Sequence, residues 1–188
     1  GGTGSTVRSC SINSSILGGF KNIIGAGNEL STSNVKNSAI VGGACNIVGT
    51  CSTSSMIIGG FKNSISCCVY SSAIIGSDGS VINSAANPGT LYNGQFWTNR
   101  AFIGGGSGNK ICRVQDSAII GGNTNLLWHN GPNGNYTFQP TILGGNKNCI
   151  VTYGNYSSIV GGLQNCIVNK SCSSVILGGC GNRIFMDN

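Results

Sequence analysis

Few residues in this 188-residue chain could carry out acid–base or metal chemistry. The four acids are Glu29, Asp78, Asp116 and Asp187, and the only histidine is His129. General acid–base catalysis needs at least two such groups held together, and these acids are far apart along the chain. We therefore expect no catalytic residue, no metal ligand and no cofactor, and we do not expect an enzyme.

Aromatic side chains offer a different kind of chemistry. Two segments, at about 80–98 and 126–140, contain both tryptophans, all three prolines and the only histidine. Aromatic rings interleaved with Asn and Gln amides can stack on sugar rings and hydrogen-bond their hydroxyls. The alternative is that these rings pack against each other or seal an interface between protomers. The candidate ligand-binding residues are Tyr92, Phe96, Trp97, Trp128, His129, Tyr136 and Phe138.

A repeat spans nearly the whole chain and must position these segments. The pattern is Ser-x-aliphatic-aliphatic-Gly-Gly-x-x-Asn-x-aliphatic, usually 17 residues long, and residues 24–28 repeat it in shortened form. Its first glycines are Gly18, Gly42, Gly59, Gly76, Gly104, Gly121, Gly144, Gly161 and Gly178. Each unit reads as two short strands joined by a glycine turn, and so small a unit cannot bury its own apolar face. We expect a single all-β domain over 1–188, a parallel β-solenoid of about nine to ten coils, with loop insertions at 80–98 and 126–140.

Two columns of side chains follow from stacking these units. The asparagine after each glycine pair should form a ladder in which each amide bonds the next, about 4.8 Å away. Two adjacent aliphatic residues precede each glycine pair, as in Ile159 and Val160. Because side chains alternate across a strand, one of the two should fill the core and the other should face outward. An outward apolar ridge favours burial against other copies around a three-fold axis, unless a flat coil places both columns inside.

The ten cysteines partly follow the same columns. No pair has the C-x-x-C spacing that zinc sites favour. Cys51 and Cys68 share one position of the repeat, and Cys149 and Cys166 share another. Stacked coils would bring each pair to strand spacing, where an inter-coil disulfide is sterically possible. The alternative is that these cysteines remain buried thiols that pack as small apolar residues.

Composition narrows the class of partner. Only 7% of the residues are charged, and the net charge of +6 comes from single, scattered Lys and Arg residues. Nucleic-acid binding needs clustered cations, which the sequence does not contain. No apolar run approaches the roughly 20 residues of a membrane-spanning helix. We therefore expect neither nucleic-acid binding nor membrane insertion.

The repeats carry a family resemblance. Residues 157–165 (SSIVGGLQN) and 174–182 (SVILGGCGN) resemble the head repeats of YadA-type trimeric adhesins. They resemble still more closely the Gly-Gly-x-x-Asn repeats of phage and giant-virus fibre proteins. The resemblance implies a left-handed parallel β-roll that assembles as a trimer and acts in adhesion or receptor binding. The longer unit and the many cysteines depart from the bacterial adhesins and favour a viral or other surface fibre.

These observations predict a trimeric fibre or adhesin module at an extracellular or virion surface. Its partners would be two further copies of itself and a host receptor or carbohydrate, bound multivalently through the aromatic insertions. One alternative is a purely structural solenoid that assembles into a shell, matrix or filament. A second is an ice-binding solenoid that displays the serine column Ser14, Ser38, Ser55, Ser72, Ser117, Ser157 and Ser174.

Overall fold

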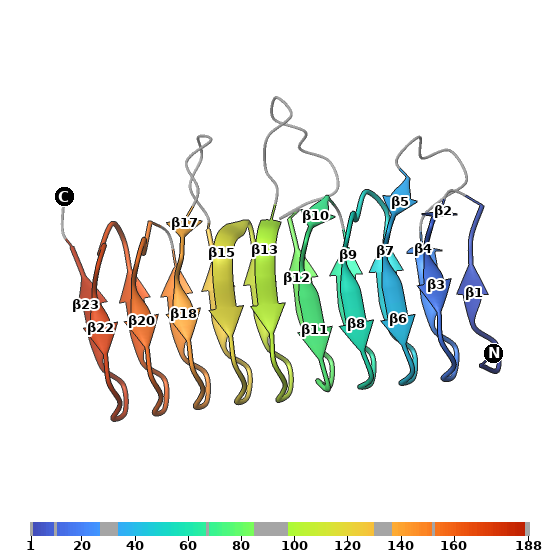
Figure 1. Cartoon of the computed structure of the whole chain (residues 1–188). Helices are drawn as coiled ribbons and strands as arrows, with labels where there is room; N and C mark the ends of the chain where they lie inside the picture. Colours follow the sequence, from blue (N-terminus) through green and yellow to red (C-terminus); the bar gives the residue numbers. More distant parts are fainter. Residues whose placement is uncertain are drawn as a thin grey trace.

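A computed structural model describes residues 2–9, 11–26, 34–66, 68–84, 98–129, 137–151 and 153–186, which form short β-strands and turns and contain no helix. The coils stand in a row from the N-terminal to the C-terminal end (Figure 1). Neighbouring coils pair in parallel, as in Ile57 with Ile74 and Ile150 with Ile167. The parallel β-solenoid predicted from the repeat is therefore confirmed.

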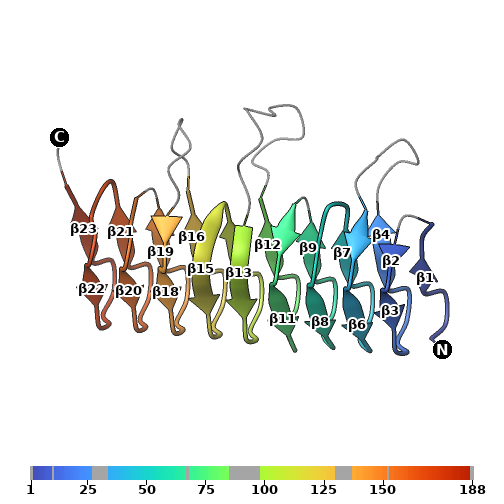
Figure 2. The same ribbon diagram turned by 45° about the horizontal axis from the view of Figure 1, so that its top comes forward.

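Each coil contributes one strand to each of two main sheets, which face each other across the core (Figure 2). The ten-stranded sheet has the order β1 (Thr6–Val7), β4 (Ile23–Ala26), β7 (Ile47–Gly49), β9 (Ser64–Ser66), β12 (Val81–Asn83), β14 (Lys110–Cys112), β16 (Leu126–Trp128), β19 (Cys149–Val151), β21 (Cys166–Val168) and β23 (Arg183–Phe185).

The eleven-stranded sheet runs beside it. Its main path is β22 (Val175–Ile176), β20 (Ser158–Ile159), β18 (Thr141–Ile142), β15 (Val114–Ile119), β13 (Thr98–Ile103), β11 (Ala73–Ile75), β8 (Met56–Ile58), β6 (Ala39–Val41) and β3 (Ser15–Ile16). Two further strands, β10 (Val69–Tyr70) and β17 (Thr137–Phe138), pair with β13 and β15. A separate pair is formed by β2 (Ser11–Ile12) and β5 (Val35–Lys36).

The core is built mainly from one aliphatic side chain of each main sheet in each coil, and Val35, Val69, Ala101 and Val114 add to it. In the eleven-stranded sheet, the first residue of each aliphatic pair points inward, as Ile40, Ile57 and Ile159 do, all fully buried. The second residue points outward. Leu17, Leu143 and Leu177, for example, are 61%, 47% and 77% exposed. The expectation that one column is internal and the other external is confirmed, and the alternative of two internal columns is wrong.

One unit departs from the predicted alignment. Ile74 pairs with Ile103 and Ile103 with Ile119, so Ile103 is the inward residue of its coil and Phe102 faces outward. Gly104 then takes the outward position that Ile75 holds in the coil before, and the first glycine of this turn is Gly105 rather than Gly104. A Cβ on Gly104 would lie 2.7 Å from the Ile120 carbonyl and 3.0 Å from the Phe102 ring, which explains why the extra residue is glycine.

Two further boundary predictions need correction. Residues 24–26, the described part of the shortened repeat at 24–28, do not form a separate glycine turn, because Ile24 lies in β4 and packs in the core between β1 and β7. The predicted insertions at 80–98 and 126–140 are too wide, because β12, β16 and β17 occupy parts of them as regular strands. Their central parts, 85–97 and 130–136, lie outside the described residues.

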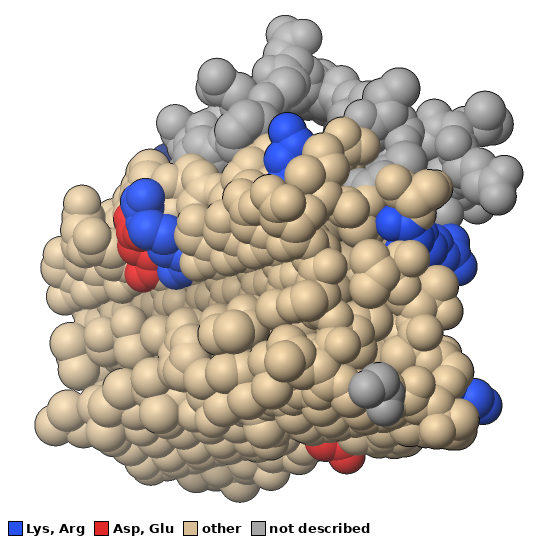
Figure 3. Space-filling view, turned by 45° about the vertical axis from the view of Figure 1, so that its right-hand side comes forward, with Lys and Arg blue, Asp and Glu red and all other residues tan. Residues whose placement is uncertain are grey.

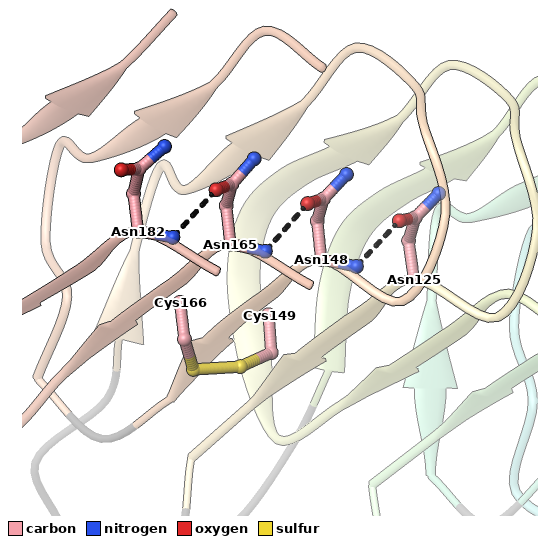
Figure 4. Close-up of a disulfide and its surroundings, with 6 residues drawn as sticks. All are labelled: Asn125, Asn148, Cys149, Asn165, Cys166 and Asn182. Atoms are coloured by element: carbon pink, nitrogen blue, oxygen red, sulfur yellow. Dashed lines mark hydrogen bonds between the residues drawn. A yellow bond between two sulfur atoms is a disulfide. The ribbon is translucent and has the colours of Figure 1, made fainter. Parts of the chain in front are cut away.

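The asparagine column forms a ladder, with a hydrogen-bonding pattern different from the expected one. The amides do not bond one another. Instead, each Oδ1 accepts from the backbone N–H of the equivalent residue in the next coil, at 2.9 Å for Asn148 to Asn165 (Figure 4). Most Nδ2 groups donate to glycine carbonyls, as that of Asn148 does to Gly144 and Gly162, whereas that of Asn63 donates to the Ser77 carbonyl. Ser80 takes one place in the ladder, accepting through Oγ from the Asn109 N–H.

The second glycine of each turn is required by this ladder. Gly145 has a φ of 86°, and a Cβ there would meet the Gly162 carbonyl and the Asn148 amide. The left-handed conformation and the lack of space both exclude a side chain. The turns are therefore tight, because each asparagine side chain must reach backbone carbonyls of its own turn and of the next one.

The serine column is internal. Ser38, Ser55, Ser72, Ser117 and Ser157 are at most 2% exposed. Several of these hydroxyls accept from the next coil, as Ser38 Oγ does from the Ser55 N–H at 3.2 Å. A surface row of hydroxyls for ice binding is therefore absent at this column, and that alternative is wrong. The hydroxyls of Ser38, Ser72 and Ser157 instead accept from backbone N–H groups of the next coil.

Candidate functional site

Apart from the Arg100–Asp116 ion pair on β13 and β15, the outer face of the eleven-stranded sheet carries mostly small and apolar side chains. Its strand register aligns small and apolar side chains from Ser15 through Phe102 to Val175. Beside them runs the outer ridge, which consists of Leu17, Val41, Ile58, Ile75, Ile120, Leu143, Val160 and Leu177. In Figure 3 the charged residues form a few small groups, and most of the surface between them is uncharged. Such a continuous apolar face on a soluble protein is typical of an interface.

The strands that precede the two long insertions, β12 and β16, end on the side where the strands that follow them, β13 and β17, begin; we call it the insertion side, and it is the top in Figure 1. Asn83, Cys112 and Trp128 are register partners, so the ends of β12 and β16 are two strand spacings apart, about 10 Å. The returning residues Thr98 and Thr137 are both fully buried. Thr98 Oγ1 donates to the Asn83 carbonyl at 2.8 Å. The attachment points of both insertions are thus close together and anchored in the core.

His129 is part of this anchor. The imidazole is only 1% exposed, and its Nδ1 lies 3.1 Å from Thr137 Oγ1. The Tyr153 ring packs edge-on against it with centroids 5.0 Å apart. Burial, and then the positive charge of Arg113, lowers the pKa of His129 to about 4. The histidine is therefore neutral near pH 7 and closes the coil where the second insertion begins, which is a structural position rather than a displayed one.

The other predicted site residues divide into two groups. Trp128 is half-buried at the end of β16, and Phe138, on β17, is 37% exposed. Both belong to regular strands beside the second insertion rather than to the insertion itself. Tyr92, Phe96, Trp97 and Tyr136 lie outside the described residues.

Two further aromatic residues on the insertion side were missed. Tyr156 is 60% exposed, and its backbone N–H donates to the Phe138 carbonyl at 2.9 Å. Tyr153 contacts His129, as described above. Both follow β19 at the position where the preceding coil carries its insertion. The sequence shows that both tyrosines occupy the repeat position of the insertions, but their own coil has no insertion, so composition alone did not indicate them.

Within the described part of the chain, the charged residues do not converge on a catalytic arrangement. Arg100 in β13 pairs with Asp116 in β15, and hydrogen bonding to Arg100 lowers the pKa of Asp116. Asp78 lies in a glycine turn and pairs by backbone with Phe61 and Ser107. The two aspartates are thus on different sides of the solenoid. Among the described residues, no three His, Cys, Asp or Glu side chains cluster in a way that could hold a metal ion.

One of the two possible disulfides is formed. Cys149 and Cys166 are register partners in β19 and β21, with Cα atoms 4.7 Å apart, and their sulfurs are bonded (Figure 4). Cys51 has a free thiol, so the pairing with Cys68 is not present. Both of these cysteines lie at left-handed corners with φ of 58°, outside the strand register, and the Cys68 N–H reaches Thr50 O only at 3.4 Å. Burial, and then electrostatic interaction with Cys68 and Cys51, raises the pKa of nearby Tyr70.

No protein-family model matches this chain, and no curated protein matches it significantly. The part of the chain that the structure describes contains no helix long and apolar enough to cross a membrane.

Proposed function

We propose that this chain is a module of a surface fibre or adhesin that assembles as a homotrimer and binds a receptor or glycan multivalently on its insertion side. The observation that carries the proposal is the exposed apolar ridge on the outer face of the eleven-stranded sheet. Its ridge residues Leu17, Ile120 and Leu177 are 61%, 47% and 77% exposed in the single chain. Burying them against two further copies would remove this apolar area from water.

The first glycines of the C-terminal turns, which follow the ridge residues, support the same contact between copies of the chain. At Gly121, Gly144, Gly161 and Gly178, no atom of the chain lies within 4 Å of the place a Cβ would occupy. None of the four has a left-handed φ. The protomer itself does not require glycine there, whereas a partner backbone approaching the ridge closely would.

The insertion side supports the binding role. The attachment points of the two insertions lie together on a rigid scaffold, beside the partly exposed rings of Trp128, Phe138 and Tyr156. A rigid trimer would present three such groups in one direction. Three weak sites on one rod bind a repetitive surface more tightly than a single site does.

The test compares glycan-array binding of the full chain with that of two variants, Trp128→Ala and Phe138→Ala. We expect each variant to lose at least about tenfold in binding while its mass in solution is unchanged. Leu163→Ala is the matched control, because Leu163 is 41% exposed in a glycine turn on the other side of the coil. Dissociation of the two aromatic variants would contradict a binding role and indicate packing between protomers. Open-ended polymers of the full chain would favour the purely structural filament.

A further inference from the structure

The same five residues, Gly-Gly-Phe-Lys-Asn, form the glycine turns of two coils, at 18–22 and 59–63. The coil between them has Ala44 and Cys45 in place of Phe and Lys. Parallel backbone bridges join Phe20 to Ala44 and Ala44 to Phe61. The two phenylalanines therefore lie two strand spacings apart, about 9.6 Å, with only a methyl group between them. They are on the glycine-turn side, which is at the bottom of Figure 1 and opposite the insertion side.

Each ring is displayed together with its own lysine. Phe20 and Phe61 are 46% and 43% exposed. The Lys21 ammonium lies 5.0 Å from the Phe20 ring centroid, and the Lys62 ammonium lies 4.8 Å from that of Phe61. Among the described residues, the only ion pair joins Arg100 and Asp116. Within this part of the chain neither lysine is therefore neutralised by a carboxylate.

The backbone holds both pairs in one geometry. Lys21 and Lys62 have left-handed φ values of 51° and 54°. The next residues, Asn22 and Asn63, are fully buried members of the asparagine ladder. A site carried on such a fixed ladder loses little conformational freedom on binding.

We propose that Phe20, Lys21, Phe61 and Lys62 form a binding site for an anionic polysaccharide, which would lie along the glycine-turn side across Ala44. Each ring offers an apolar surface on which the C–H face of a sugar can pack. Each ammonium can pair with a carboxylate or sulfate group. The alternation of ring and charge at every second coil suits an extended chain in which every second sugar is charged.

Asp78 sets the polarity and the limit of this site. It follows Phe61 in the same column of backbone bridges and is exposed. Its negative charge repels an anionic chain that continues past Phe61 toward the C-terminal coils. The site therefore spans the coils from Phe20 to Phe61, and removing the Asp78 charge should strengthen binding.

The experiment measures binding of the full chain to two size-matched octasaccharides, one from heparin and one from hyaluronate, by calorimetry at low salt. We expect binding to at least one of them, and the difference between the two distinguishes sulfate from carboxylate recognition. The variants Phe20→Leu with Phe61→Leu and Lys21→Ala with Lys62→Ala should each weaken binding by at least about tenfold. Asp78→Asn should strengthen it about twofold.

Two controls share the backbone position of the tested residues. Lys147 lies at the same turn position as Lys21 and Lys62 but follows Asn146 instead of a phenylalanine. Leu163 lies in the same column as the two rings and is similarly exposed, at 41%. Lys147→Ala and Leu163→Ala should change the affinity less than twofold. Because the phenylalanines are half-exposed, their leucine variants should keep the thermal stability of the parent.

Three results would overturn the proposal: no binding to either octasaccharide, unchanged affinity in the leucine variants, or an equal loss with Lys147→Ala. The last would indicate attraction to net charge alone. Receptor binding on the insertion side is measured separately, on the glycan array with Trp128→Ala and Phe138→Ala. The failure of this site can therefore be distinguished from failure of receptor binding on the insertion side.

Discussion

The glycine turns of the N-terminal and C-terminal coils share one sequence pattern and differ in backbone conformation. In the N-terminal turns the Gly59 N–H donates to the Val41 carbonyl of the preceding coil, and Gly59 has a φ of 66°. In the C-terminal turns the Leu143 N–H donates to the Ile159 carbonyl of the following coil, and Gly144 is not left-handed. The first glycine of the repeat is therefore explained by backbone conformation in the N-terminal coils and needs a different explanation in the C-terminal coils.

A glycine can be required by its backbone conformation or by lack of space for a side chain, and the first glycines of the turns allow these two causes to be distinguished. The N-terminal first glycines, Gly18, Gly42, Gly59 and Gly76, all have φ values between 58° and 84°. A side chain there would be strained even though the space beside it is open. The C-terminal first glycines have neither restriction within the protomer. Glycine in those turns is consequently evidence about what lies outside the single chain.

The largest effect should come from the second glycine, which both halves need. Gly145→Ala combines a left-handed φ of 86° with a clash against the Gly162 carbonyl. We expect a loss of about 4 kcal/mol in the free energy of unfolding. Chemical denaturation followed by circular dichroism measures it. A loss of less than 1 kcal/mol, on the order of an ordinary surface substitution, would show that the turn can relax and that the ladder does not require this glycine.

The disulfide should make the C-terminal coils more stable than the N-terminal ones. It closes a loop of 17 residues, and its removal should cost about 3 kcal/mol. We expect Cys149→Ser with Cys166→Ser to lower the unfolding free energy and to increase hydrogen exchange around β19 and β21. Cys51→Ser is the control in the N-terminal half and should have little effect, because its thiol is free. Equal losses in the two variants would contradict this assignment.

The buried histidine should give the C-terminal half an acid-sensitive corner. The pKa of His129 is lowered to about 4 in the folded protein and is near 6.5 in an unfolded chain. The unfolded state therefore binds more protons between these values, and stability falls as the pH drops through this range. Between pH 7 and 5 the loss should be about 2 kcal/mol. His129→Asn should flatten this dependence, and an unchanged slope in that variant would assign it to other groups.

The smallest effect is expected at the first glycines of the turns, and it tests directly whether the N-terminal and C-terminal turns differ. Gly59→Ala should cost about 1 kcal/mol because of its left-handed φ. Gly144→Ala should leave the unfolding free energy of the protomer unchanged or raise it by about 0.5 kcal/mol. Parallel denaturation curves of the two variants, measured at concentrations where the chain is monomeric, give the difference. Equal costs would mean that the two halves do not differ as described.

The repeat was sufficient to predict the solenoid, because a 17-residue period leaves stacking as the main way to bury one aliphatic residue per strand. It was not sufficient where the period changes. The extra glycine at Gly104 was aligned as the first glycine of its turn, and only the pairing of Ile103 with Ile74 reveals the shift. The geometry of the asparagine ladder was also missed, because a repeated Asn indicates stacking without showing which partner each amide chooses.

The candidate site was harder to predict for a related reason. Trp128 and His129 stood out by composition and were assigned to an insertion, whereas the strand pairing places Trp128 in β16 and buries His129 beside it. Tyr156 is more exposed than either but lies in a coil of normal length. Exposure depends on which corner of a coil a residue occupies, and this depends on strand ends that composition alone does not define.

The most direct test of the proposed assembly is the native mass of the full chain by light scattering over a range of concentrations, with and without reductant. We expect about three times the 19.1 kDa protomer mass for the full chain. When Gly144 and Gly161 are both replaced by valine, we expect the mass to fall to that of the protomer. A 19.1 kDa species at every concentration would contradict burial of the outer ridge between copies. A trimer that persists in the valine variant would place the contact away from these glycines.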